Sequence, residues 1–185
     1  MSQLTREIRE AARALLRDKQ VQVVIGFEEG SLPLKARPCF IRKEEDVDRL
    51  VWNGFSDINV ARYLVKRKEK ASLVAKGCDS RALVELIKEN QVARDQVIVI
   101  GVPCEGMIDR TRVEAEAGHE AIVKVEETEN RLTLRGRAFE KVLDRPFQKI
   151  GQRSMLIDGK MAEPVDDLGP EPDGVGLSLR SITHL

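Results

Sequence analysis

Apolar residues fall into one long helical pattern, followed by several short and nearly uninterrupted runs. Residues 3–19 carry apolar side chains three and four positions apart among charged ones, which predicts an amphipathic helix. The runs 21–27, 72–75 and 96–100 are short, mostly apolar and each close to a glycine. They are too short for helices, and their composition predicts three buried strands.

Helices are expected between these strands. Residues 44–52 place acidic residues before apolar ones, as the N-terminal half of a helix does, and residues 58–67 carry apolar side chains at helical spacing. A further helix is expected after the second strand, capped by Asp79 or Ser80. Residues 28–38 contain one glycine and two prolines, which predicts a loop or irregular crossover.

The alternation of strands and helices is typical of a parallel sheet with crossover connections. We therefore predict an α/β fold for residues 1–112: a small, mostly parallel sheet in a three-layer arrangement. This domain is expected to carry whatever site the protein has, because open parallel sheets bind ligands at the carboxyl ends of their strands.

The pattern changes after about residue 110. Residues 121–125 and 131–135 alternate around a polar turn, and residues 154–161 resemble a hairpin on an Asp-Gly turn. A short antiparallel β extension is therefore expected over residues 113–162. The final segment, 163–185, is rich in proline, glycine and acidic residues, and it is expected to be a mobile tail.

Composition narrows the class of protein. Of the 185 residues, 42% are hydrophobic and 34% are charged, as in a globular protein. Lysine plus arginine and aspartate plus glutamate number 31 each, so the chain lacks the basic surplus of a dedicated nucleic-acid-binding protein. The first residues lack the apolar core of a signal peptide, and the apolar runs are too short to span a bilayer. A cytoplasmic protein without membrane insertion is expected.

Two cysteine-bearing loops carry the most distinctive chemistry: Lys-Gly-Cys-Asp-Ser-Arg at 76–81 and Gly-Val-Pro-Cys-Glu-Gly-Met at 101–107. Each follows a predicted parallel strand, and one strand–helix–strand unit separates Cys78 from Cys104. If the two strands are neighbours, both thiols reach one common site. Cys78 lies just before a predicted helix, where the helix dipole favours the thiolate over the thiol.

Other residues of the two loops are candidates for cofactor binding because they surround the cysteines. Glycine permits close approach of a ligand to the backbone, and proline stiffens the second loop. Arg81 is suited to an anionic cofactor or partner, although a surface salt bridge explains it equally well. The candidate cofactor contacts are Gly77, Asp79, Ser80, Arg81, Gly101, Pro103 and Gly106.

The cysteines also have a plainer interpretation, because cysteine is among the most buried residue types. Cys39, between a proline and a phenylalanine, lacks a glycine-flanked loop, so burial is its default interpretation. Nucleophilic catalysis usually needs a nearby base, but the two histidines, His119 and His184, form no recognisable dyad with a cysteine. They fit no zinc-ligand spacing either, which disfavours a classical hydrolase or zinc enzyme.

The segments 23–27, 73–82 and 97–107 resemble the N-terminal domain of the coenzyme F-420 hydrogenase/dehydrogenase β-subunit family. That family includes related iron–sulfur subunits of formate dehydrogenase and heterodisulfide reductase complexes in anaerobes. The resemblance covers roughly residues 1–112, and the two cysteine loops are its most specific part. The resemblance implies electron transfer through 4Fe–4S clusters. It also implies that, as in some members, a bound flavin (FAD or FMN) takes part and the deazaflavin coenzyme is reduced.

The chain departs from this family in its cysteines. Family members continue into further cysteine motifs, whereas no cysteine follows Cys104 and the chain has three in all. An ordinary 4Fe–4S cluster needs four thiolates. Three outcomes stay open: a cluster on Cys78, Cys104 and Cys39 with a fourth ligand that is not cysteine or comes from a partner; loops that bind a cofactor or dock a redox partner; or a subunit that lost its redox centre.

The leading hypothesis is a cytoplasmic subunit of an anaerobic oxidoreductase complex of the hydrogenase, formate dehydrogenase or heterodisulfide reductase type. It would support electron transfer together with other subunits, and it is not expected to be catalytic on its own. The alternatives are a non-redox structural or assembly subunit and a flavin-binding enzyme. The last is weakened because Gly26 and Gly30 are too widely spaced for a dinucleotide-binding fingerprint.

Overall fold

The computed structural model describes residues 2–104, 106–118, 121–128, 131–144 and 147–148. Its largest sheet has four strands in the order β2–β1–β3–β4. Neighbouring pairs β1–β3 and β3–β4 are parallel, whereas β2 pairs with β1 antiparallel. The strands are β1 (Val23–Glu29), β2 (Ala36–Ile41), β3 (Ala71–Ala75) and β4 (Val97–Gly101). The predicted α/β fold with a mostly parallel sheet is confirmed.

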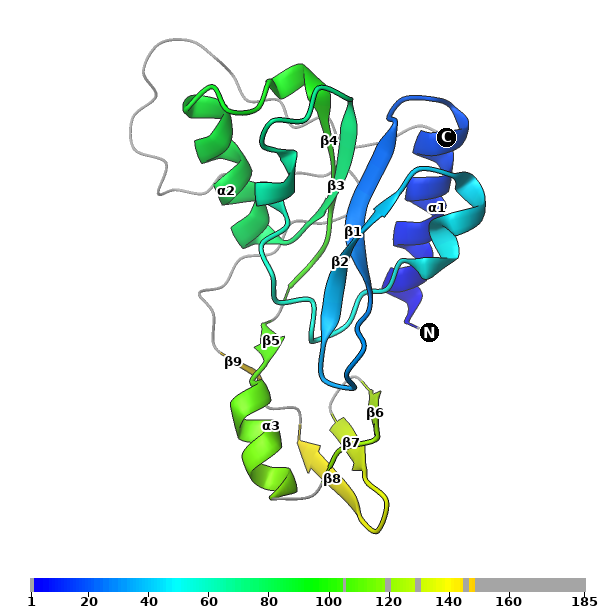
Figure 1. Ribbon diagram of the computed structural model, residues 1–185, viewed down its shortest axis with the longest axis vertical. Helices are drawn as coiled ribbons and strands as arrows, with labels where there is room; N and C mark the ends of the chain where they lie inside the picture. The colour runs from blue at the N-terminus through cyan, green and yellow to red at the C-terminus, as the bar shows by residue number, and fades with distance from the viewer. Residues whose placement is uncertain (1, 105, 119–120, 129–130, 145–146, 149–185) are drawn as a thin grey trace.

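Helices α1 (Gln3–Arg17) and α2 (Gly77–Lys88) cover opposite faces of this sheet (Figure 1). Alternation along β1 divides the core accordingly: Val24 packs with the α1 residues Ile8, Ala12 and Leu15, whereas Phe27 packs in the cluster that includes Leu83 of α2. The Ser2 side chain accepts a hydrogen bond from the Thr5 backbone N–H and so caps α1.

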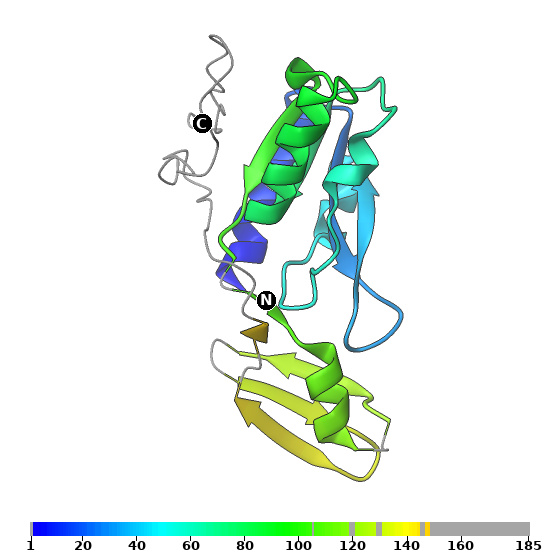
Figure 2. The same cartoon turned by 90° about the vertical axis from the view of Figure 1, so that its left-hand side faces the viewer.

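A second, smaller body lies beyond the carboxyl ends of the parallel strands (Figures 1 and 2). It contains α3 (Arg110–Ala117) and an antiparallel sheet of β6 (Lys124–Glu127), β7 (Arg131–Arg135) and β8 (Glu140–Asp144). The short strands β5 (Met107–Ile108) and β9 (Phe147–Gln148) pair with each other beside it. The antiparallel extension is therefore present, although α3 and β8 were not anticipated from the sequence pattern.

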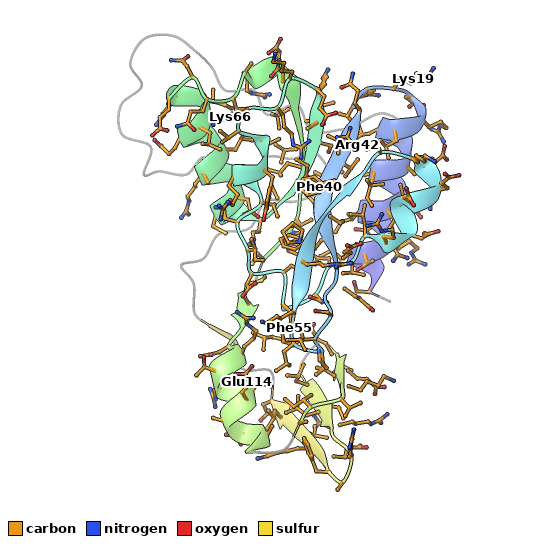
Figure 3. All side chains as sticks on the ribbon, in the orientation of Figure 1. Lys19, Phe40, Arg42, Phe55, Lys66 and Glu114 are labelled. Atoms are coloured by element: carbon orange, nitrogen blue, oxygen red, sulfur yellow. The ribbon has the colours of Figure 1, made fainter. Side chains whose placement is uncertain are left out.

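The two bodies meet at Gly54. Its backbone N–H donates to a Glu127 side-chain oxygen at 2.9 Å, and its carbonyl accepts from the Ile108 backbone N–H at 2.8 Å. A Cβ at position 54 would lie 2.4 Å from Ile108 Cδ1 and 2.9 Å from Glu127 Oε1, so the absence of a side chain permits this approach. Figure 3 shows Phe55 at the same junction, where it joins the core that continues into the second body.

Two predicted helices are wrong. Residues 44–52 form only a 3-10 helix at Glu44–Arg49, because the Val51 backbone N–H donates to the Phe27 carbonyl at 2.8 Å and draws the chain alongside β1. Residues 58–67 contain only a 3-10 helix at Ala61–Leu64, and Lys66 has a φ of 65°, which an α-helix cannot accommodate. A third 3-10 helix, Arg94–Gln96, precedes β4.

The loop predicted for residues 28–38 is also partly wrong, because β1 continues to Glu29 and β2 begins at Ala36. Pro38 lies within β2, opposite Phe27. A proline has no N–H to donate, and an edge strand tolerates it where that position faces away from the neighbouring strand. β2 is such an edge strand, because it lies at the end of the strand order β2–β1–β3–β4.

Several further expectations concern residues outside the described part of the chain. The predicted hairpin at 154–161, the predicted tail at 163–185 and both histidines, His119 and His184, belong there. Among the described residues, no helix combines the length and the apolar character needed to cross a membrane.

Candidate functional site

Cys78 and Cys104 follow neighbouring parallel strands, as the sequence pattern predicted. Ala75 at the end of β3 pairs with Gly101 at the end of β4, and the Val102 backbone N–H donates to the Ala75 carbonyl at 2.9 Å. Each cysteine lies three residues beyond its own member of this pair. Cys78 is exposed and Cys104 is half-buried, and both are free thiols. We call this part of the molecule the two-cysteine edge.

A buried ion pair fixes the start of α2 beside Cys78. The Lys76 side chain is 2% exposed and the Asp79 side chain is 0% exposed, and Lys76 Nζ lies 3.0 Å from Asp79 Oδ2. Lys76 Nζ also donates to the Ile58 carbonyl at 2.9 Å. Asp79 accepts two backbone N–H groups, those of Val60 at 3.2 Å and Lys76 at 3.1 Å. The ammonium of Lys76 and both carboxylate oxygens of Asp79 therefore have hydrogen-bond partners within the protein.

This arrangement corrects the predicted helix cap. α2 begins at Gly77, so Lys76 is the N-cap residue and Asp79 is the third helical residue, whose carboxylate bonds back to the Lys76 N–H. That bond is the returning half of a capping box. Ser80 donates weakly from its hydroxyl to the Lys76 carbonyl, at 3.4 Å. Neither Asp79 nor Ser80 is the N-cap, and the buried Asp79 is held by the protein itself.

The other candidate cofactor contacts lie around the cysteines. Gly77 is the first residue of α2, and Gly101 is the last of β4. Arg81 is exposed and makes no ion pair with any residue in the described ranges. Pro103 and Gly106 line the neighbouring cleft, and Gly106 has a φ of 129° that disfavours any side chain there.

The environment of Cys78 does not favour the thiolate, contrary to the expectation from the helix N-terminus. Partial burial of the thiol raises the pKa of Cys78 above its ordinary value, and the Asp79 carboxylate and Cys104 add to this. The nearby Lys76 ammonium acts in the opposite direction but does not reverse the shift. Cys78 is therefore mainly a thiol at neutral pH unless a ligand displaces its proton.

Cys39 lies apart from the two-cysteine edge. It is 2% exposed and packs in the cluster beneath α1, on β2 opposite Gly26. Burial raises the pKa of Cys39 to about 12, and the Glu28 carboxylate contributes in the same direction. Glu28 is itself held by Arg37 and Arg49, each at 2.9 Å. The plain interpretation of Cys39 as a buried core residue fits this environment.

The raised pKa of Cys39 predicts a loss of stability in alkali. An ordinary cysteine pKa of 9.0 applies in the unfolded chain, so between pH 9.0 and about 12 the unfolded thiol ionises while the folded one keeps its proton. The folded state then binds more protons, and the free energy of unfolding falls by up to about 1.4 kcal/mol per pH unit. Urea unfolding at about pH 8 and about pH 10 should show a larger alkaline loss in the natural protein than in Cys39→Ala. Equal losses would contradict the assignment.

A cleft of about 1350 Å³ adjoins the two-cysteine edge, between the end of the parallel sheet and the second body. Cys104, Pro103 and Gly106 line it from one side. Trp52 and Phe55 contribute aromatic surface, and the exposed apolar residues Leu32 and Val123 also line it. Lys35, Glu29 and Glu127 add charged groups of both signs. A mixed apolar and polar cleft of this size is suited to a small organic ligand or a segment of a partner protein.

The described residues do not by themselves fit a 4Fe–4S cluster. No group of three or more histidine, cysteine, aspartate or glutamate residues is close enough to hold a metal ion anywhere in the described ranges. A cluster needs four ligands, and the two-cysteine edge offers two thiols. We therefore derive no chemical step through a cluster on this chain alone.

Sequence reasoning missed two parts of the site. The cleft depends on contacts between residues 51–55 and the second body, which no local pattern encodes, although the Asn53-Gly54 break was visible. The buried Lys76 was also missed. A lysine directly before a helix that carries an acid at its third position was the available signal, since the two side chains then lie close together.

Comparisons with known proteins concern the fold. No protein-family model matches the chain. A chain of the F420-reducing NiFe hydrogenase complex from Methanosarcina barkeri, solved in a study of its xenon derivatization, superposes with a TM-score of 0.54 at 13% sequence identity. The match covers 74% of this chain and 52% of the hydrogenase chain, so this chain spans about half the length of its structural relative. Most of this chain therefore shares the fold of about half of a chain from a hydrogenase complex.

Proposed function

We propose that this protein is a subunit of an anaerobic, cytoplasmic oxidoreductase complex and supports electron transfer with partner subunits. The two-cysteine edge would face the redox partner. The observation that carries this proposal is the pair of free thiols at matched positions after neighbouring parallel strands. The carboxyl ends of parallel strands are where such sheets place their binding sites.

The shared fold adds support, since the hydrogenase chain that superposes on this one belongs to a multi-subunit complex. The proposal extends to complexes of the hydrogenase, formate dehydrogenase or heterodisulfide reductase type. The match covers 52% of the hydrogenase chain, so the proposal draws only on the part that the two chains share. Catalysis by the isolated chain is not part of the proposal.

Within such a complex, the residues of the edge have distinct roles. Lys76 and Asp79 hold the start of α2 in place, and Cys78 and Cys104 contact the partner or complete a ligand set with it. Arg81, exposed one turn of helix beyond the edge, is available for an acidic group on the partner. A 4Fe–4S cluster at this edge would need its further ligands from the partner, because Cys39 lies in the core under α1.

The test is to isolate the tagged full chain with its partners from anaerobically grown cells of the source organism. Electron transfer to a viologen dye, iron, acid-labile sulfide and visible absorbance would be measured on the complex. In Cys78→Ser/Cys104→Ser we expect the complex to assemble but the rate to fall at least about tenfold, which corresponds to about 1.4 kcal/mol in the activation barrier. Cys39→Ala is the matched control, and its rate should stay within about twofold of the natural protein.

The non-redox alternative makes the opposite prediction. If the double variant assembles and transfers electrons at the natural rate, the two-cysteine edge has no redox role and the protein is a structural or assembly subunit. Iron and sulfide that survive in the double variant would assign the metal to a partner alone. The first result overturns the redox role of the cysteines, and the second excludes them as cluster ligands.

The cleft favours a second candidate, a flavin-binding protein. Trp52, which is half-buried, provides aromatic surface in the cleft that Cys104 also lines, and flat aromatic ligands stack on such side chains. FAD or FMN would occupy the cleft with its ring near this surface. Isolated chain purified in the dark and denatured should then release flavin in a ratio near one per chain. Purified chain that binds neither added FAD nor added FMN excludes this candidate.

A further inference from the structure

The geometry of the two-cysteine edge bears on the chemistry of the isolated chain as well. Cys78 and Cys104 each lie three residues past a register pair, Ala75 and Gly101, at which two parallel strands are hydrogen-bonded. Neighbouring strands are about 4.8 Å apart. Disulfides span Cα separations of about 4.4–6.8 Å, so the strand spacing matches the reach of a disulfide.

One further observation supports proximity of these thiols, and two others show that they are available to a reagent. The charge of Cys104 contributes to the raised pKa of Cys78, as a nearby like charge does. Neither thiol is taken up by a metal-binding group within the described ranges. Cys78 is exposed and Cys104 lines an open cleft, so a small reagent has access to both.

We propose that Cys78 and Cys104 form a reversible dithiol–disulfide pair within one chain. The oxidant is another disulfide, either a low-molecular-weight disulfide or one on a protein partner. One cysteine thiolate attacks a sulfur of that disulfide and releases one thiolate; the second cysteine then attacks the mixed disulfide and releases the other. Two protein thiols become one S–S bond, and two electrons and two protons pass to the reagent, which leaves as two thiols.

Closure of this bond would join two separate parts of the site. Cys78 belongs to α2, whose start is fixed by the buried Lys76–Asp79 pair, and Cys104 belongs to the wall of the cleft. The disulfide would therefore tether the cleft wall to a rigid helix start. The inference requires neither a cluster nor a partner, and so it stands apart from the proposed function.

The test uses the isolated, full-length chain after treatment with a chelator and a reductant, transferred without oxygen into glutathione buffers of graded ratio. Intact mass distinguishes an internal disulfide, which removes two hydrogens, from a glutathione adduct. At about 1 mM reduced glutathione we expect the internal disulfide to exceed the mixed disulfide at least about tenfold, as an effective concentration of about 10 mM or more requires. Peptide mapping should assign the bond to Cys78 and Cys104.

Three variants make the assignment specific. Cys78→Ser and Cys104→Ser should each form only a glutathione adduct at the remaining member of the pair, while Cys39→Ala should still close the internal bond. Circular dichroism confirms that each variant is folded. Three results would each overturn the inference: adducts on Cys78 and Cys104 of the natural chain without an internal bond, a bond that includes Cys39, or disulfides only between chains. Because no partner is present, these results are independent of the electron-transfer test on the complex.

Discussion

Asp79→Ala is expected to lower the free energy of unfolding by about 3–5 kcal/mol, the usual cost of removing one partner of a buried ion pair. The substitution leaves the Lys76 ammonium, 2% exposed, without its carboxylate. It also removes the acceptor of the Val60 and Lys76 backbone N–H groups. Typical domains have only about 5–15 kcal/mol of stability, so chemical unfolding should show a clear shift of the midpoint.

Glu85→Ala is the matched control on the same helix. Glu85 is exposed and contacts Lys88 at 3.3 Å in a surface pair, which contributes less than about 1 kcal/mol. Lys76→Met tests the other partner: it leaves Asp79 with its two backbone donors, so we expect a smaller loss than for Asp79→Ala. Similar stability of Asp79→Ala and Glu85→Ala would contradict the role given to the buried pair.

Phe27→Ala is expected to cost about 3–5 kcal/mol, as for other large aromatic side chains removed from a core. Phe27 is 0% exposed, and its ring lies edge-on to Trp52 with centroids 5.8 Å apart. Lys76 Nζ lies 5.3 Å from the same ring centroid. The side chain therefore supports both the cleft, through Trp52, and the two-cysteine edge, through Lys76.

Trp52 provides an independent measurement, because it is the chain's single tryptophan. In folded Phe27→Ala its emission should shift to longer wavelength, since the cavity admits water or frees the indole ring. Phe40→Ala is the control: Phe40 is half-buried on β2, with Tyr63 and Arg67 against its ring, and its loss should cost less, about 1–3 kcal/mol. An unchanged tryptophan spectrum in Phe27→Ala would show that the two rings do not depend on each other.

Much of the first body could be predicted because its signals are local. The apolar stripe of residues 3–19 and the β-branched runs report their burial directly, and α1, β1, β3 and β4 lie where these patterns placed them. The failures came from tertiary hydrogen bonds. Val51 donates to Phe27 rather than continuing a helix, and no pattern within residues 44–52 reports that bond. β2 was missed because prolines occur both in loops and in edge strands, so their presence in a sequence does not distinguish the two.

The candidate site, too, could be predicted from the sequence only in part. The pairing of the strands that precede Cys78 and Cys104 followed from the strand–helix–strand order, because consecutive parallel strands usually pair. The raised pKa of Cys78 did not follow, since it depends on burial by groups distant in sequence. The cleft was invisible for the same reason: Trp52, Cys104 and Val123 converge only in three dimensions.

Pro38 on the edge strand β2 has a consequence for how this protein behaves in concentrated solution. An open sheet edge is a template on which a second chain can add a strand, and such additions lead to fibres and precipitates. At Pro38 the outer side of β2 offers no N–H, so an incoming strand would lose one hydrogen bond in the middle of the six-residue strand. The exposed, charged Arg37 beside it adds a further obstacle to a flat apolar contact. The sheet can thus present the two-cysteine edge to other molecules while this lateral edge resists self-association.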